Sequence, residues 1–561
     1  MEVGSTAAKS PSVVVRLTPP ARAHGAALLS AQALADYAVI IAWLRSNGGD
    51  TESAWVRDPG AAVVAVGGSY GGMLAGWLRY TYPASVAGAI AASAPIWGLP
   101  LTAPPLDGSA VATSRGFGTA GGAPERCADH LLAAWPVMEV VGRTQAGRDL
   151  IADALDLCDP LETTAQVAAL SAAIQNTFFD LSEGDYPFPS TYITSAVGPG
   201  TYPLPAWPMR VACAGLAEDL GISIDGDTAS VAFTVTALPT DPAATAPVAV
   251  SVSWGAATGE PGADDVAGSG IPALLRGVKQ AYGVWCNVTG ELACFPLAGC
   301  GTGAKPAQAE KPAEEPAKEP AEPPSQRVDT DKAESADKVG GSGGTCSVST
   351  LGGSWEAVCC NDDMNLVNYL VTGAGRDVYW PPSVVDSGWQ ALPYDEQLTR
   401  ALGPYGEQGP GCASRPGVFG YPARSDPWSA WMDASFGGLG ITSGASNIIF
   451  SNGLLDPWSA AGVYPGAGPP PPGPYDGPVV LNLTADGALQ AVVLDLGAHH
   501  LDLMFMDDND PPCAAEARDA ERAAIEKWAA QFRAAHGAGA KSRAGRAAGR
   551  RAAAPRAGRE L

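Results

Sequence analysis

The segment GGSYGG at residues 67–72 constrains the fold of this chain more than any other feature of the sequence. It follows a short, partly β-branched run, AAVVAV, and it opens a helical stretch that ends before Pro83. A strand, a sharp turn and a helix in this order fit the nucleophile elbow G-x-S-x-G, with Gly67, Ser69 and Gly71 in the motif positions. Neighbouring side chains would collide in so tight a turn, and glycine on both sides of the serine removes the collision. An ordinary glycine-rich turn is the alternative interpretation.

A serine hydroxyl is a weak nucleophile at neutral pH, so it needs a base, and the base needs an orienting carboxylate. The chain has five histidines, and only the pair His499 and His500 follows a late strand pattern, AVVLDL. Asp456 lies in the loop after NIIFSNG, which gives the hydrolase order Ser, Asp, His. Taken singly, the Asp before Pro is usually a turn former and the paired histidines are often merely solvated. Together they predict a catalytic triad.

The helix after Ser69 points its N-terminus at the serine, where the helix dipole is positive. The amide of Tyr70 is therefore predicted to donate a hydrogen bond to a developing oxyanion.

The other patterns predict an α/β fold, namely an α/β-hydrolase core with a large inserted helical cap domain. Residues 30–47 have the spacing of an amphipathic helix, and residues 86–96 read as a second buried strand. Helical periodicity dominates the region after this strand, and a final helix is predicted for residues 513–536. The expected order is a poorly ordered N-terminus (1–25), a first core segment with the elbow (26–100), the helical cap (101–440) with a disordered acidic, Pro-rich insertion (301–344), a second core segment (441–536) and a disordered basic tail (537–561).

Composition excludes several partners. The formal net charge of −24 disfavours nucleic acid and anionic membranes, and no run of apolar residues is long enough for a spanning helix. The eleven cysteines show no paired spacing with histidines, so we expect disulfides, no metal site and no cofactor. The sequons at Asn287 and Asn482 point weakly to the same secretory route. No signal peptide is visible at the start, which suggests that the true N-terminus is absent from this chain.

Five segments carry a resemblance to a known family: GGSYGGMLAGWLRYTYP, DYPFPSTYI, LPAWPMRVAC, SNIIFSNGLLDPWS and GAHHLDL. They are similar to the signature segments of the family that contains lysosomal Pro-X carboxypeptidase, dipeptidyl peptidase II and thymus-specific serine protease. The resemblance implies a serine exopeptidase that acts on proline-containing peptides in a lysosomal, vacuolar or secreted setting. It assigns the base to His499, the first of the pair, and suggests Met73 and Trp458 as walls of a proline pocket, although both are equally readable as core residues. A homodimer is left open.

The sequence also departs from this family. An early segment with several strands is missing, so the core is expected to be N-terminally truncated and to lack one oxyanion donor. Two functions from different classes therefore stand: a proline-directed serine exopeptidase, either a carboxypeptidase or a dipeptidyl peptidase, and a catalytically inactive hydrolase-fold protein that binds peptides or partners. A lipase or esterase is a weaker third interpretation.

Overall fold

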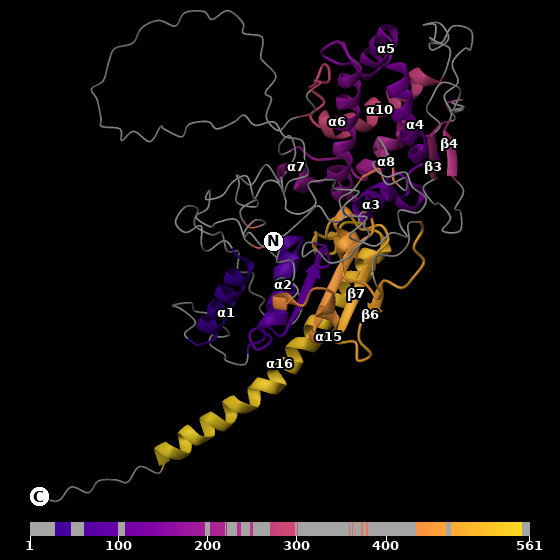
Figure 1. Cartoon of the computed structure of the whole chain (residues 1–561). Helices are drawn as coiled ribbons and strands as arrows, with labels where there is room; N and C mark the ends of the chain where they lie inside the picture. The colour runs from indigo at the N-terminus through magenta and orange to yellow at the C-terminus, as the bar shows by residue number, and fades with distance from the viewer. Residues whose placement is uncertain are drawn as a thin grey trace, which may run out of the picture.

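Figure 1 shows the whole chain as a computed structural model. The structure describes residues 29–46, 61–98, 107–196, 202–218, 220, 233–236, 247–250, 270–297, 300, 358, 362, 372–373, 377–379, 434–466 and 473–552, with side chains in the last helix up to His536. The N-terminal segment predicted for residues 1–25 and the insertion predicted for residues 301–344 lie outside the described residues.

A five-stranded sheet with the order β1-β2-β5-β7-β6 forms the core that holds the predicted catalytic residues. The first four strands in this order are parallel, and β6 pairs with β7 in the antiparallel direction at one edge. The strands are β1 (Val64–Gly68), β2 (Gly88–Ala92), β5 (Ile448–Gly453), β6 (Val480–Asn482) and β7 (Leu489–Leu494). A mixed sheet with helices confirms the α/β class in its coarse form.

Helices cover both faces of this sheet (Figure 1). Alternate residues of a strand point to opposite faces, and in β2 Ala89 and Ala91 join one buried cluster while Ile90 joins another. The first cluster includes side chains of α1 (Ser30–Ser46) and α2 (Tyr70–Thr81), and the second includes side chains of α16 (Pro512–Ala552). The sheet is therefore the middle of three layers.

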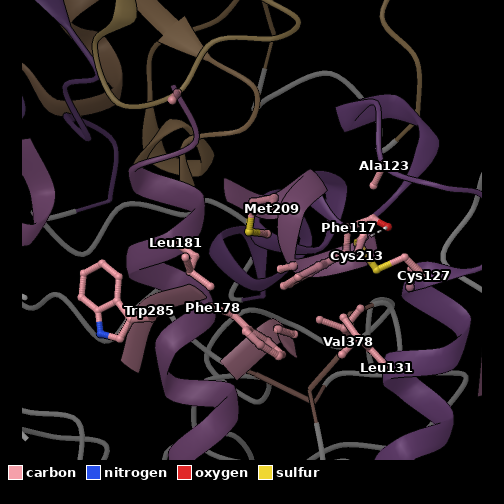
Figure 2. Close-up of a cluster of buried hydrophobic side chains, with 14 of the residues drawn as sticks. Phe117, Ala123, Cys127, Leu131, Phe178, Leu181, Met209, Cys213, Trp285 and Val378 are labelled. Atoms are coloured by element: carbon pink, nitrogen blue, oxygen red, sulfur yellow. Dashed lines mark hydrogen bonds between the residues drawn. A yellow bond between two sulfur atoms is a disulfide. The ribbon is translucent and has the colours of Figure 1, made fainter. Parts of the chain in front are cut away.

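A helical region, residues 107–297, lies in the chain between β2 and β5, and its buried side chains join the same apolar cluster as Ile90 and the side chains of α16. Figure 2 shows the part of this cluster where the rings of Phe117 and Phe178 meet edge to face with centroids 4.7 Å apart. Its elements are α3 (Gly108–Gly116), η3 (Thr119–Gly121), α4 (Cys127–Val141), α5 (Gln145–Leu155), α6 (Thr164–Glu183), α7 (Tyr192–Ala196), α8 (Pro208–Cys213), η4 (Ala214–Leu216), the antiparallel pair β3 (Phe233–Thr236) and β4 (Pro247–Val250), and α10 (Ile271–Cys286).

The longest helix of this region, α6, begins where the sequence supplies its capping groups. The hydroxyl of Thr163 accepts a hydrogen bond from the backbone N–H of Gln166, and the Gln166 side chain accepts one from the backbone of Thr163. This reciprocal capping box satisfies two N–H groups that a helix start leaves open. The helix then runs to Glu183, which brings its C-terminal end to the loops that follow β5 and β7.

Within the described residues, three disulfides link parts of the helical region: Cys127–Cys213, Cys158–Cys294 and Cys286–Cys300. They agree with the expectation of disulfides drawn from the cysteine spacing. In the described residues, Cys513 is a free, buried cysteine.

Replacing both Cys127 and Cys213 with alanine is expected to lower the free energy of unfolding by about 2–5 kcal/mol, because this bond closes a loop whose ends are 86 residues apart. Denaturant titration of the purified variants measures the change. Cys513→Ala is the matched control, since it removes a buried sulfur without opening a loop. Equal losses in the double variant and the control would contradict the expectation.

The C-terminal end of the chain differs from the sequence-based expectation. The sequence predicts that the last helix ends at His536, but the helical backbone of α16 continues to Ala552. Residues 537–552 are rich in alanine and arginine, which have high intrinsic helix propensity, and they continue a helix that has already begun, although glycines interrupt them.

Short one-turn elements complete the described fold: η9 (Gly438–Gly440), α15 (Ile441–Gly444), η10 (Pro457–Ala461) and η11 (Leu501–Leu503). None of the helices in the described ranges is long and apolar enough to cross a bilayer.

Candidate active site

Ser69 lies between the last residue of β1 and the first residue of α2, as the motif predicts. Its backbone has φ 58° and ψ −132°, a positive-φ conformation that L-residues rarely adopt and that costs on the order of 1–3 kcal/mol. Two backbone hydrogen bonds stabilise this strained conformation: the Ser69 N–H donates to the Ala92 carbonyl at 2.9 Å, and the Ser69 carbonyl accepts from the Met73 N–H at 3.1 Å. The predicted strand, turn and helix are confirmed.

The structure requires glycine at two positions around Ser69, and one of them is not the position that the motif predicts. A Cβ at Gly67 would overlap the Gly71 carbonyl, as expected. A Cβ at Gly71, however, would meet nothing within 4 Å, whereas one at Gly72 would lie 2.7 Å from the Ala92 carbonyl. The close approach on the helix side is therefore made at Gly72. The expectation for Gly71 was wrong because a side chain at this first turn of the helix would point into open space.

Asp456 and His499 meet in a buried hydrogen bond. Asp456 Oδ2 lies 3.0 Å from His499 Nδ1, and the side chains are 0% and 3% exposed. The other carboxylate oxygen, Oδ1, accepts from the backbone N–H of Trp458 at 3.0 Å and so caps η10. Asp456 follows β5 and His499 follows β7, so both lie beyond the carboxyl ends of neighbouring parallel strands, at the same sheet edge as Ser69.

The two histidines have opposite electrostatic settings. Burial lowers the pKa of His499, but the Asp456 and Glu183 carboxylates outweigh burial and raise the pKa above its ordinary value. Burial and the nearby His499 hold the pKa of His500 well below its ordinary value. His499 is thus the ring that can take up and hold a proton beside a carboxylate, while His500 stays neutral.

His500 connects His499 to the turn that holds Ser69. Its backbone N–H donates to Ser93 Oγ at 2.7 Å, and a Cβ at Gly68, next to Ser69, would lie only 2.5 Å from its ring. Its Nε2 lies 3.2 Å from the hydroxyl of Tyr192 on α7. The ring therefore packs between the nucleophile turn and the helical region.

The structure brings two of the three predicted catalytic side chains into contact. Among the described residues, no hydrogen bond joins Ser69 Oγ to His499. The free ring nitrogen of His499, Nε2, lies 3.4 Å from Glu183 Oε1 instead. Catalytic hydrogen bonds are commonly loose without substrate and tighten when it binds. Ser69 nevertheless lies at the same end of the parallel strands as His499, and the neighbours of these two residues, Gly68 and His500, are in close contact.

Glu183 was not predicted from the sequence. It is the last residue of α6, and its carboxylate approaches His499 although the two residues lie far apart in the chain. A single glutamate near the end of an amphipathic helix is usually solvated, so the local pattern carries no signal for this contact. Its neighbour Ser182 donates to the Leu455 carbonyl at 2.6 Å, and Tyr186 donates to the His499 carbonyl at 3.0 Å.

The remaining predicted site residues occupy different settings. Tyr70 begins α2, so its amide lies at the positive end of that helix, and its hydroxyl lies 2.7 Å from Ser30 Oγ. Met73 is fully buried in the core on one face of the sheet. Trp458 is partly exposed, and its ring meets Phe179 of α6 edge to face with centroids 5.4 Å apart. Trp458 therefore lies where the core and the helical region meet.

The two sequons also differ in accessibility. Asn287 is partly buried beside a cavity of about 590 Å³ in the helical region, and its side chain is hydrogen-bonded to both backbone groups of Leu292. Asn482 is exposed on the edge strand β6, and its Oδ1 accepts from Gln490 at 3.1 Å.

We expect a glycan on Asn482 and little or none on Asn287 when the chain is made in a secretory host, because the Asn287 amide is tied into the fold. Mobility before and after treatment with an N-glycosidase measures this. Asn482→Gln should remove the shift and Asn287→Gln should leave it. The reverse pattern would show that the folded accessibility of the two amides does not decide the outcome.

Comparison with known proteins adds to this geometry. The sequence profile described as serine carboxypeptidase S28 matches residues 21–198, which include Ser69. The chain is 27% identical over 508 residues to proteins named lysosomal Pro-X carboxypeptidase from Homo sapiens and Pongo abelii, covering 90% of this chain and 69% of each relative. It is 33% identical over 194 residues to the putative serine protease pcp-1 of Caenorhabditis elegans, covering 33% of this chain and 31% of that protein.

Proposed function

The chain belongs to the serine carboxypeptidase S28 family and is a serine-type peptidase, and from this premise we propose that it hydrolyses peptide bonds next to proline near a chain end. The observation that carries the proposal is the buried Asp456–His499 hydrogen bond beside the strained Ser69 turn. The relatives named Pro-X carboxypeptidase support the preference for proline.

In the proposed mechanism, His499 Nε2 takes the proton of Ser69 Oγ as the oxygen attacks the scissile carbonyl. The negative oxygen of the tetrahedral intermediate is stabilised by the amide of Tyr70 at the start of α2. His499 then gives the proton to the leaving amine, which breaks the peptide bond and leaves an acyl-enzyme ester. Water, deprotonated by the same ring, hydrolyses the ester and regenerates Ser69. Asp456 orients the ring through Nδ1 and stabilises the imidazolium.

We further propose that the helical region forms a cap over this site and that the chain acts in a lysosomal compartment. The contacts of Ser182, Glu183 and Tyr186 with the loops after β5 and β7 support the first point. The names of the relatives and the three disulfides support the second, because disulfides persist in secretory and oxidising routes.

Two measurements test the proposed function. A fluorophosphonate probe should label the folded protein at Ser69, and mass spectrometry of a proline-containing peptide should show loss of one C-terminal residue or of an N-terminal dipeptide. No labelling and no cleavage would favour a hydrolase-fold protein that only binds peptides.

Trp458→Ala tests the proline pocket. The indole lies partly exposed at the junction of core and helical region, so its loss should lower the preference for proline over alanine at the cleaved position by about tenfold. The ratio of kcat/KM for two otherwise identical peptides measures this. An unchanged ratio would remove Trp458 from the pocket.

A further inference from the structure

Glu183 places a carboxylate from the helical region directly against the catalytic imidazole. Its Oε1 lies 3.4 Å from His499 Nε2, and its side chain is only 14% exposed. The position is fixed by the backbone as well, because the Glu183 carbonyl accepts a hydrogen bond from His499 N–H at 3.2 Å. Glu183 is therefore held at this place by contacts that do not depend on its charge.

The side of the ring on which Glu183 lies decides what it can bind. His499 Nδ1 is occupied by Asp456, so Nε2 is the nitrogen that must exchange protons with Ser69 and with the leaving group. A carboxylate within 3.4 Å of Nε2 is consequently on the substrate side of the base. It lies close to the scissile bond of any peptide bound there.

The charges around this carboxylate are mostly acidic. Within the described residues, the ionisable groups that face Glu183 are His499, Asp456 and Asp180, which lies one helical turn earlier on α6 and whose raised pKa, about 8, keeps it protonated in acid. Tyr192 of α7 also faces it. A substrate carboxylate in this place would be repelled, whereas an ammonium group would find an oxygen partner.

Apolar and hydrogen-bonding groups complete this corner of the site. The Trp458 side chain lies near the Glu183 carboxylate and partly offsets the rise in the pKa of Glu183, and the Trp458 ring meets Phe179 edge to face. Burial raises the pKa of Glu183, and burial of a carboxylate is costly unless a cation compensates it. The Trp458 and Phe179 rings could pack against the pyrrolidine ring of a proline, while the Glu183 carboxylate could bind an amino group next to it.

We propose that Glu183 binds a protonated amino group of the substrate, so that the enzyme favours peptides with a free N-terminus close to the proline over peptides that present a C-terminal carboxylate. The inference rests on the proposed function and deepens it, because it selects the release of N-terminal dipeptides as the main reaction. Glu183 is in this view a specificity-determining residue.

The test compares blocked and free substrates with the full chain. Alanyl-prolyl-aminomethylcoumarin presents a free amino terminus next to proline, and its N-acetyl form removes that charge. N-acetyl-lysyl-prolyl-aminomethylcoumarin offers a side-chain ammonium instead, and N-acetyl-prolyl-phenylalanine offers a free C-terminal carboxylate. Glu183→Gln keeps the shape and removes the charge, Glu183→Asp keeps the charge, and Glu162→Gln, an exposed glutamate just before α6, is the matched control.

We expect Glu183→Gln to lower kcat/KM for the free-amino substrate by about 10- to 100-fold, mainly through KM, the size expected for a hydrogen bond to a charged group. The acetylated substrate should change less than about threefold, and the substrate with a free carboxylate should be cleaved as well or better. Glu183→Asp should retain some of the preference, and Glu162→Gln should retain all of it. A charge-dependent gain for the lysyl substrate would identify the side-chain ammonium as a second source of the same recognition.

Other outcomes overturn the inference and are distinguishable from failure of the proposed function. Equal losses of kcat for all substrates in Glu183→Gln, with slower fluorophosphonate labelling and an altered pH profile, would mean that Glu183 only positions His499. Unchanged substrate ratios, with labelling at the wild-type rate, would mean that Glu183 binds no amino group. Loss of labelling and cleavage in the wild type defeats the proposed function itself.

Discussion

Ser69→Ala is expected to reduce the cleavage of a proline-containing peptide by about 10⁶-fold and to abolish fluorophosphonate labelling, because no other group would be placed to form the acyl-enzyme. His499→Ala should have an effect of similar size, since without the ring the serine keeps its proton. The stability of the folded state should change little, because the hydroxyl of Ser69 makes no hydrogen bond within the described residues. Steady-state kinetics and thermal unfolding of each variant measure the two effects separately.

Asp456→Asn gives a third arm to the same prediction. The amide keeps the shape but removes the charge that raises the pKa of His499, and a fall of about 10⁴-fold in kcat is expected. Ser85→Ala is the control and should be fully active, because Ser85 follows the C-terminal end of α2, at the opposite end of that helix from Ser69. Cleavage by Ser69→Ala at more than about a hundredth of the wild-type rate would contradict the assignment.

The melting temperature is expected to be highest near pH 5 and to fall by about 5–10 °C by pH 8. Burial raises the pKa of Asp180 to about 8 and that of Asp185 to about 7, and it raises the pKa of Glu521 well above its ordinary value. A group whose pKa is raised in the folded state adds stability below its unfolded pKa, near about 4, and loses it as the pH rises toward the folded pKa. The relevant window is therefore about pH 4 to 8.

Two other groups act within this window. His499 has a raised pKa and adds to the same trend, whereas the lowered pKa of His500 stabilises the fold above about pH 6.5 and costs stability below it. His500 therefore limits the gain at the acidic end. The formal net charge of −24 at pH 7 works with the carboxyls, because protonation reduces self-repulsion.

Neutral isosteres test the carboxyl contribution directly. Glu521 lies on α16 near Asp502, and both side chains are buried, so the Asp502 carboxylate adds to the rise in the pKa of Glu521; Glu521→Gln should therefore flatten the fall in melting temperature between pH 5 and 8. Asp185→Asn is a less suitable probe, because Asp185 accepts a hydrogen bond from Met209 N–H. Exposed Glu162→Gln should leave the slope unchanged. A melting temperature that rises from pH 5 to 8 would contradict the prediction.

The sequence predicted well those features that short segments determine. The strand, turn and helix around Ser69 follow from one glycine-rich motif, and the helix at residues 30–47 and the strand within 86–96 agree with α1 and β2. Chain order and the strand patterns before each residue predicted that Asp456 pairs with one of the two adjacent histidines, and the family resemblance selected His499. Parallel strands place their carboxyl ends at one edge, so order along the chain was enough to bring these two groups together.

Features that depend on long-range packing were not predicted. Glu183 meets His499 only because α6 ends against two loops of the core, and nothing in its neighbouring residues indicates this. The need for glycine at 72 rather than 71 arises from the Ala92 carbonyl of the next strand, which the motif does not contain. The antiparallel strand β6 is three residues long, too short for a periodic pattern to reveal.

The junction between α6 and the core has a mechanical consequence. Ser182, Glu183 and Tyr186 hold the loops of Asp456 and His499 through three hydrogen bonds to backbone atoms. Moving α6 away from the core would therefore displace His499, the ring that we propose as the base. If the proposed function holds, a peptide has to reach His499 without movement of α6, which a loose chain end does far more easily than the middle of a folded protein.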